Sequence, residues 1–325
     1  MSSRIEYIDR LKGLAILAVV MGHIIYFVFH LSDDPVWGYI YSFHVPLFIF
    51  LSGYVIFTPP HLLKLTKKII ALLMPAITIG GFLCYVTSRS FMYFVTDDME
   101  LGYWYLFVLA FFYLLLTPFR LKLKCDKLVI KILIDAGLAL GVWIVLFLLS
   151  RYVLSKNITN ILSLNSCYNL WPFFILGYLF RKWDLTKEIM RRNWIFSVSL
   201  LSYVSIKLSL DNGLKMHFIP LIMSFCAIMS LFCLFGWREN KHTVFDRQLG
   251  LIGRNTLDIY IYHYFLLQMI SLPLLGKWIS STGNYFIEGV LLILLSLSIA
   301  YASIVIGKTI KKSHWLGKVV YGRFF

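Results

Sequence analysis

Charged residues are scarce in this sequence. Asp, Glu, Lys and Arg make up only 14% of the 325 residues, whereas a soluble globular domain contains about 25%. Hydrophobic residues make up 59%, and apolar runs near 20 residues long recur along the whole chain. A helix of that length crosses a hydrocarbon core of about 30 Å. The composition therefore excludes an ordinary soluble globular protein and predicts an all-α, polytopic membrane protein.

Several familiar sequence signals are also missing. The five cysteines include no CxxC pair, and their odd number indicates neither a disulfide framework nor a metal site. No HExxH, GxSxG, P-loop or GxGxxG pattern occurs, so nothing favours a metalloprotease, a serine hydrolase or a nucleotide-binding fold. No small-residue cleavage site follows the first apolar run, which we therefore expect to remain in the mature protein.

The apolar runs predict about ten membrane spans. They lie at residues 12–30, 38–57, 69–87, 101–118, 131–150, 166–180, 194–209, 217–236, 256–275 and 286–307. No internal repeat and no separate soluble stretch is visible, so residues 1–325 are expected to form a single membrane domain. Of the 31 basic residues, 25 fall on one side of the predicted membrane and 6 on the other.

The uneven distribution of basic residues predicts the orientation of the chain. The positive-inside rule places the richer side, and with it both termini, in the cytoplasm. Much of the net charge of +15 is then explained by membrane topology. We therefore expect the chain to interact with the lipid bilayer and not with nucleic acid.

The first predicted span carries a stripe of ionisable residues within DRLKGLAILAVVMGH. At about 100° per residue, Lys12 and His23 lie within about 20° of each other, roughly 16 Å apart along the axis. Asp9 and His30 fall on the same stripe, whereas Arg10 points elsewhere and is interpreted as an ordinary cationic helix end. An intramembrane histidine marks a functional site by default. A hydrogen bond within the bundle is the alternative interpretation.

Two other predicted spans also contain polar residues. The second span contains His44 and Ser52, and Pro46 between them is expected to distort the helix and free a backbone carbonyl near His44. The ninth span contains His263 and Tyr260. Because buried histidines need polar partners, these residues favour a buried polar site. The tyrosines of the ninth span are interpreted as packing or an aromatic belt, with an acceptor pocket as the alternative.

Two stretches, YIDRLKGLAILAVVMGH and IYSFHVPLFIFLSGYVIF, resemble the opening of the membrane-bound acyltransferase-3 family. The most similar branch is that of fucose 4-O-acetylase-like bacterial sugar O-acetyltransferases. The resemblance continues through KKIIALLMP, WYLFVL, FILGYLF and GRNTLDIYIYH. It implies a multi-pass enzyme of the bacterial inner membrane that moves an acetyl or other short acyl group from cytoplasmic acyl-CoA to a sugar hydroxyl. The acceptor would be a cell-surface or secreted glycan or a lipid-linked sugar.

The resemblance also implies roles for individual residues. The essential basic residue and histidine of the family's first helix correspond to Lys12 and His23, although much of the family has Arg in place of Lys12. Two arginines that often precede the proline of the third helix are replaced by Lys68 and Ala71. The acyl-CoA-binding residues implied in this way are Lys12, Lys64, Lys67 and Lys68. Acetyl-CoA would be the donor substrate, with no tightly bound cofactor and no metal.

These residues suggest a mechanism in which His23 is the general base on the acceptor hydroxyl and Asp9 orients Lys12. A transient acyl-histidine is left open. The residues expected to steady the acceptor or the developing oxyanion are His44, Ser52, His263 and Tyr260. The main alternative is a glycolipid flippase or small-solute transporter, which the missing internal repeat disfavours. A non-catalytic membrane scaffold is a third interpretation.

Overall fold

The computed structural model describes residues 5–31, 34–96, 102–120, 127–190, 192–211 and 218–322, and within these ranges every regular element is helical. The α-helices are α1 (Glu6–His23), α2 (Pro35–Tyr41), α3 (His44–Tyr54), α4 (Leu62–Val86), α5 (Phe91–Thr96), α6 (Trp104–Leu115), α7 (Leu128–Leu148), α8 (Lys156–Ile161), α9 (Leu164–Lys182), α10 (Leu185–Met190), α11 (Asn193–Asp211), α12 (Ile219–Trp237), α13 (Val244–Arg254), α14 (Thr256–Gln268), α15 (Pro273–Thr282), α16 (Tyr285–Lys312) and α17 (His314–Tyr321). Two π-helical turns, η1 (Ile24–Val28) and η4 (Leu149–Val153), and a 3₁₀ turn, η3 (Thr117–Arg120), complete the described secondary structure.

The prediction of an all-α, polytopic membrane protein is confirmed. Among the described residues, seven helical segments are long and apolar enough to cross a membrane, and the bent pair α14–α15 makes eight if it is one span. Each of the ten predicted spans overlaps one of these segments, the 12-residue α6 or the 19-residue α9. The count of ten and the cytoplasmic position of both termini stay predictions.

Some predicted features lie outside the described residues. The outermost residues of two predicted spans, 101 and 217, belong to this group. So do one cysteine and six of the basic residues that entered the orientation argument: Cys125, Arg4, Lys122, Lys124, Arg191, Lys215 and Arg323.

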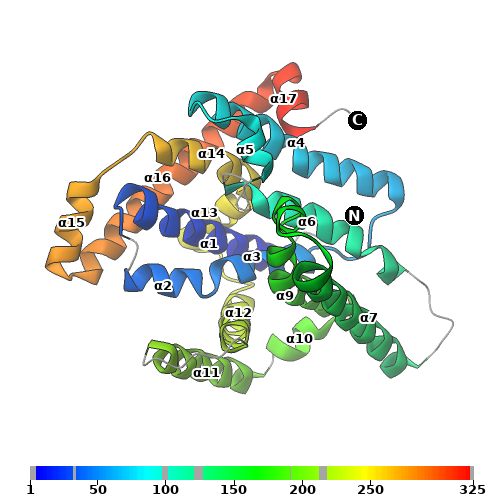
Figure 1. Ribbon diagram of the computed structural model, residues 1–325. Helices are drawn as coiled ribbons and strands as arrows, with labels where there is room; N and C mark the ends of the chain where they lie inside the picture. Colours follow the sequence, from blue (N-terminus) through cyan, green and yellow to red (C-terminus); the bar gives the residue numbers. More distant parts are fainter. Residues whose placement is uncertain are drawn as a thin grey trace. The chain divides into compact units, whose positions relative to one another are not determined.

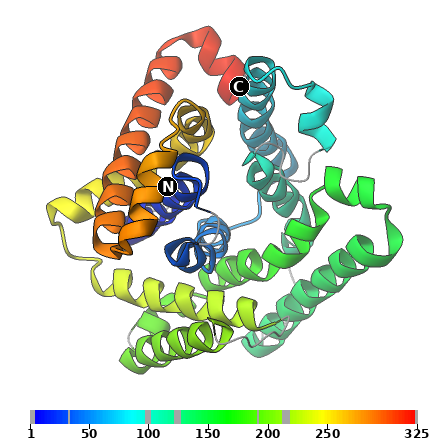
Figure 2. The ribbon, with the colours of Figure 1, turned by 60° about the vertical axis from the view of Figure 1, so that its left-hand side comes forward.

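The helices group into two compact units, each made from separate stretches of the chain. The first comprises Met1–Leu51 and Leu185–Lys308, and the second comprises Ser52–Asp184 and Thr309–Phe325. Within the first unit, α1 contacts α2, α12, α13 and α14 (Figure 1). The same unit contains the adjacent pair α11 and α12, and in the second unit α4 contacts α6 and α17 (Figure 2). A single membrane domain over residues 1–325 stays a prediction.

In the first unit, α1 and α13 cross with their backbones in contact. A methyl group added at Gly13 would overlap the carbonyl oxygen of Leu249, and one added at Gly253 would overlap the carbonyl oxygen of Asp9. Small residues permit this kind of close helix approach. The crossing therefore holds in place the beginning of α1, which carries Asp9 and Lys12.

The second predicted span is interrupted before Pro46, as expected. Helix α2 ends at Tyr41 and α3 begins at His44. Because proline has no N–H group, Pro46 cannot donate to the carbonyl of Ser42, four residues earlier. That carbonyl instead accepts a 2.6 Å hydrogen bond from the hydroxyl of Ser224 in α12. The predicted freeing of a backbone carbonyl near His44 is thus confirmed.

The ninth predicted span, residues 256–275, is not a straight helix. Helix α14 ends at Gln268, and α15 begins at Pro273 after a bend of 96°. In the break, the backbone N–H of Leu272 donates a 2.9 Å hydrogen bond to the carbonyl of Val28 at the end of η1. The end of the first span therefore supplies a partner for a backbone group in the break.

The stripe predicted on the first helix is correct as far as His23 but not as far as His30. Helix α1 is continuous up to His23, so the α-helical phase relating Asp9, Lys12 and His23 applies. The π turn η1 then changes the number of residues per turn. His30 follows with a positive φ of 57°, and its Nε2 lies 3.1 Å from the hydroxyl of Ser271.

Candidate functional site

Two histidines from different predicted spans meet in the first unit. Nδ1 of His23, at the end of α1, lies 3.0 Å from Nε2 of His263 in α14. The two imidazole rings are nearly parallel, with their centroids 5.2 Å apart. His263 is fully buried, whereas His23 is half-buried. His23 is therefore the member of the pair that a substrate can reach.

The other ring nitrogens of this pair face different surroundings. Nδ1 of His263 lies 2.9 Å from the carbonyl oxygens of both Ile259 and Tyr260. Nε2 of His23 has a long contact of 3.5 Å with the hydroxyl of Tyr264, whose ring centroid is 4.7 Å from that of His23. Both nitrogens of His263 are thus engaged by the protein at short distance, and the more open nitrogen of the pair is Nε2 of His23.

His44 joins the same region of the first unit. Its Nδ1 donates a 2.8 Å hydrogen bond to the carbonyl of Ile40, and its ring lies edge-on to Tyr41 with 4.6 Å between centroids. Tyr41 packs against Gly22, the residue before His23. Through Tyr41, His44 is therefore connected to the residue before His23 within the first unit.

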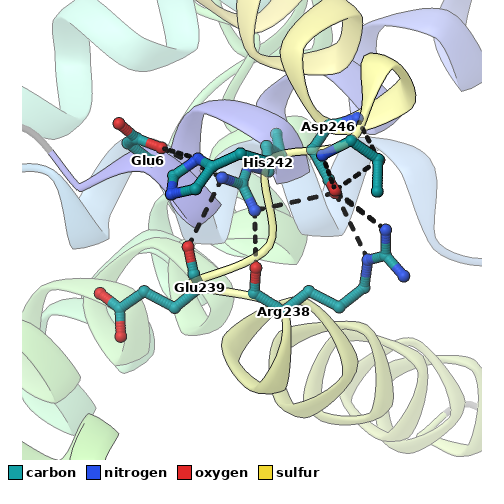
Figure 3. A network of polar contacts seen from close by, with 7 residues as sticks. Glu6, Arg238, Glu239, His242 and Asp246 are labelled. Carbon is teal, nitrogen blue, oxygen red and sulfur yellow. Dashed lines mark hydrogen bonds and ion pairs between the residues drawn. The ribbon is translucent and has the colours of Figure 1, made fainter.

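Arg10 has a different environment from the one expected. The sequence suggested a cation at the lipid headgroups, but the side chain is only 2% exposed. Its guanidinium donates to the carbonyl of Arg238 at 2.6 Å and to the carboxylate of Glu6 at 3.0 Å, and it lies 3.7 Å from Asp246. Figure 3 shows Glu6, Arg238 and Asp246 within this network. Arg10 therefore connects α1 to the loop between α12 and α13.

Asp246 is the carboxylate at the centre of this network. It accepts hydrogen bonds from the hydroxyl of Thr243 at 2.6 Å and from the guanidinium of Arg238 at 3.0 Å. Burial by itself raises the pKa of Asp246, but these hydrogen bonds outweigh burial and hold the pKa below its ordinary value. Asp246 also caps the start of α13 together with Thr243. The network therefore adds an electrostatic link to the glycine crossing of α1 and α13.

The second unit carries the three lysines predicted to bind the donor. Lys64, Lys67 and Lys68 are exposed on the first turns of α4. The ammonium group of Lys68 lies over the ring of Tyr113 in α6, 5.0 Å from its centroid. This contact orients the ammonium group of Lys68 but does not cancel its positive charge, as pairing with a carboxylate would.

Arg181, at the end of α9, is held by aromatic rings in the same way. Its guanidinium lies 5.8 Å from the ring centroid of Tyr54 and 5.5 Å from that of Phe57. The next residue, Lys182, is instead paired with the buried carboxylate of Asp135 at 2.7 Å. Because a ring does not accept the guanidinium N–H groups as a carboxylate does, Arg181 keeps donors suited to an anionic ligand.

Comparison with known proteins now identifies the family. A family model described as an acyltransferase domain matches residues 5–305. The chain belongs to this acyltransferase family. It is 24% identical over 341 residues to the nodulation protein NolL of Mesorhizobium japonicum, with 90% of this chain and 85% of NolL aligned. It is 26% identical over 153 residues to the inner membrane protein YcfT of Escherichia coli, with 46% of this chain and 41% of YcfT aligned. No solved structure matches the chain.

The family match confirms the resemblance found in the first two predicted spans. Together with the apolar helices, it establishes that the protein is a membrane acyltransferase. An enzyme is therefore favoured over the flippase, transporter and scaffold interpretations.

The predicted site residues of this acyltransferase are only partly brought together. His23 and His263 are in contact in the first unit, which also contains His44, and Tyr260 takes part through its carbonyl oxygen. Asp9 and Lys12 lie on the same helix as His23, and their roles stay predictions. Ser52 belongs to the second unit, where its hydroxyl lies 2.7 Å from that of Tyr105.

Two residues of interest were not singled out from the sequence. Tyr264 directly follows His263, and its spacing does not distinguish it from the other tyrosines of that span. Arg181 was counted among the basic residues that set the membrane orientation. The ring contacts that set it apart come from α3 and the residues just after it, more than 120 positions earlier in the chain.

Proposed function

We propose that this acyltransferase moves an acetyl or other short acyl group from cytoplasmic acyl-CoA to a sugar hydroxyl of a cell-surface or secreted glycan. The observation that carries the proposal is the half-buried His23, whose Nδ1 contacts His263 while Nε2 stays the more open nitrogen. The sugar acceptor is supported by the resemblance to the fucose acetylase-like branch. A bacterial inner membrane location is supported by the relative YcfT, which is named as an inner membrane protein.

In the proposed reaction, His23 is the general base. Nε2 takes the proton of the acceptor hydroxyl while the hydroxyl oxygen attacks the carbonyl carbon of the thioester. The new C–O bond forms and the C–S bond breaks, so that the CoA thiolate leaves and takes the proton back from His23. An imidazole suits both steps because it exchanges protons near neutral pH. A transient acyl group on Nε2 is the alternative route.

Donor binding is proposed to rest on the cations that the family resemblance implies. The phosphates of acyl-CoA are expected to contact Lys12 and the exposed lysines of α4, above all Lys68. Arg181 joins this set because its ring contacts leave its N–H groups suited to phosphate oxygens. Contact of Lys12 and Lys68 with the same donor molecule stays a prediction from the sequence.

A transfer assay tests the proposed function. Membranes containing the protein are incubated with acetyl-CoA labelled in the acetyl group and with a pool of sugars and glycolipids. We expect label in an acceptor and one free thiol per acetyl group transferred. His23→Ala should abolish transfer, whereas His314→Ala, which removes an exposed histidine of the second unit, should not. Full activity of a stable His23→Ala protein, or solute movement without acyl transfer, would contradict the proposal.

A further inference from the structure

The partners of His263 determine which of its nitrogens carries a proton. Nδ1 lies 2.9 Å from two backbone carbonyl oxygens of its own helix, those of Ile259 and Tyr260. Carbonyl oxygens only accept hydrogen bonds, so Nδ1 must carry a hydrogen. The side chain has no exposed surface, and burial favours the neutral imidazole because a charged ring loses its hydration. A neutral imidazole with a hydrogen on Nδ1 has its lone pair on Nε2.

This lone pair points at His23. The distance of 3.0 Å between Nε2 of His263 and Nδ1 of His23 is an ordinary hydrogen-bond length. The contact is attractive only if Nδ1 of His23 carries the hydrogen, because two lone pairs repel each other. The neutral ring of His23 then has an unprotonated Nε2, the nitrogen that faces Tyr264.

We propose that His263 is a positioning residue that keeps the proton of His23 on Nδ1 and thereby leaves Nε2 free to accept one. The catalytic consequence of this inference rests on the proposed function, but the proton position does not. The sequence predicts that His263 steadies the acceptor or the developing oxyanion. Because both of its nitrogens are engaged by the protein, His263 acts through His23 rather than on the substrate.

The arrangement also keeps the ring of His23 in place during proton transfer. The His263 ring is fixed by carbonyls of its own helix, so its orientation does not depend on His23. When Nε2 of His23 takes a proton, Nδ1 still donates to His263, and the positive ring keeps its acceptor. A tautomer exchange or ring rotation between turnovers is thereby avoided.

Two substitutions of similar size separate positioning from packing. In His263→Gln, the side-chain amide reaches the place of Nε2 and offers an oxygen to His23. In His263→Asn, the shorter amide reaches the place of Nδ1 and satisfies the helix carbonyls, but it leaves His23 without its acceptor. We expect His263→Asn to lower kcat about 10- to 100-fold, with KM for acetyl-CoA unchanged. His263→Gln should stay within about threefold of the wild type.

The proton position is measured separately by ¹⁵N NMR on protein labelled at histidine, with the His23 signals assigned through His23→Gln. We expect the wild-type spectrum to show Nδ1 of His23 protonated and Nε2 bare, and His263→Asn to lose this preference. A wild-type His23 protonated on Nε2, or equal loss of kcat in the two His263 variants, would overturn the inference. Absence of acyl transfer by the wild type would refute the proposed function, while the wild-type spectrum would still decide the role of His263.

Discussion

The crossing of α1 and α13 predicts that alanine substitutions at two glycines of α13 change the free energy of unfolding in opposite directions. A methyl group at Gly253 would lie 2.7 Å from the carbonyl carbon of Asp9 and 2.9 Å from the backbone nitrogen of Gly13, where ordinary contact begins near 3.4 Å. The overlap is largest at the carbonyl oxygen of Asp9 and involves backbone atoms throughout, so the two helices must separate. Overpacking of this kind costs about 1–3 kcal/mol. We expect Gly253→Ala to lower the free energy of unfolding by roughly 2 kcal/mol.

Gly250, one turn earlier on α13, is the matched control. A methyl group there meets only the flexible side chain of Arg254, at 3.6 Å. Gly250→Ala should therefore stabilise the protein by up to about 1 kcal/mol through its higher helix propensity. Unfolding is followed in mixed detergent micelles, alongside the acyl-transfer assay, because separation of the helices also displaces the beginning of α1. Equal changes of the same sign in the free energy of unfolding of the two variants would show that α1 and α13 do not pack this closely at Gly253.

Two further predictions concern charge. The carboxyl of Asp246 has its folded pKa below its ordinary value of about 3.9, so its stabilising effect is present above that pH and is lost as the pH falls through the folded pKa. Asp246→Asn should lower the free energy of unfolding by about 1–3 kcal/mol at pH 7. This loss of stability should shrink as the pH is lowered below about 3.9, as measured by unfolding between pH 7 and pH 3. Lys68→Ala and Arg181→Ala should each raise KM for acetyl-CoA about three- to tenfold with kcat unchanged in steady-state assays.

Controls for both charge predictions come from the same chain. Glu239→Gln alters an exposed side chain beside the network, and its free energy of unfolding should show no such pH dependence. An equal loss of unfolding free energy for Asp246→Asn at pH 3 and pH 7 would contradict the stabilising role of the ionised Asp246. Arg151→Ala removes an exposed cation that is predicted to lie on the opposite side of the membrane. As the control for Lys68→Ala and Arg181→Ala, it should leave KM for acetyl-CoA unchanged. Unchanged donor dependence in both Lys68→Ala and Arg181→Ala would remove these residues from the proposed donor site.

Features that depend on neighbours along the chain were predictable from the sequence. The shared face of Lys12 and His23 requires only an uninterrupted α-helix, which α1 provides. The freed carbonyl of Ser42 follows from the missing N–H of Pro46. In both cases the cause lies within a few helical turns of its effect, so local geometry was sufficient.

Features that depend on long-range packing were not predictable. His23 and His263 are 240 positions apart, and helical phase shows which face each occupies but not that the two faces meet. The burial of Arg10 depends on backbone carbonyls after α12, which a count of charges does not reveal. The bend after Gln268 escaped prediction because its apolar flanks continue the hydropathy of a single span.

The hydrogen bond between Leu272 and Val28 has an evolutionary consequence. The π turn and the bent span each leave the regular helical pattern, and each supplies a backbone group that the other uses. A mutation that straightened only one of them would leave the backbone group of the other without its hydrogen-bond partner, so the two irregularities should be inherited together. Among homologues, a single-residue deletion within 24–28 should therefore accompany a change of length or of proline position within 269–273.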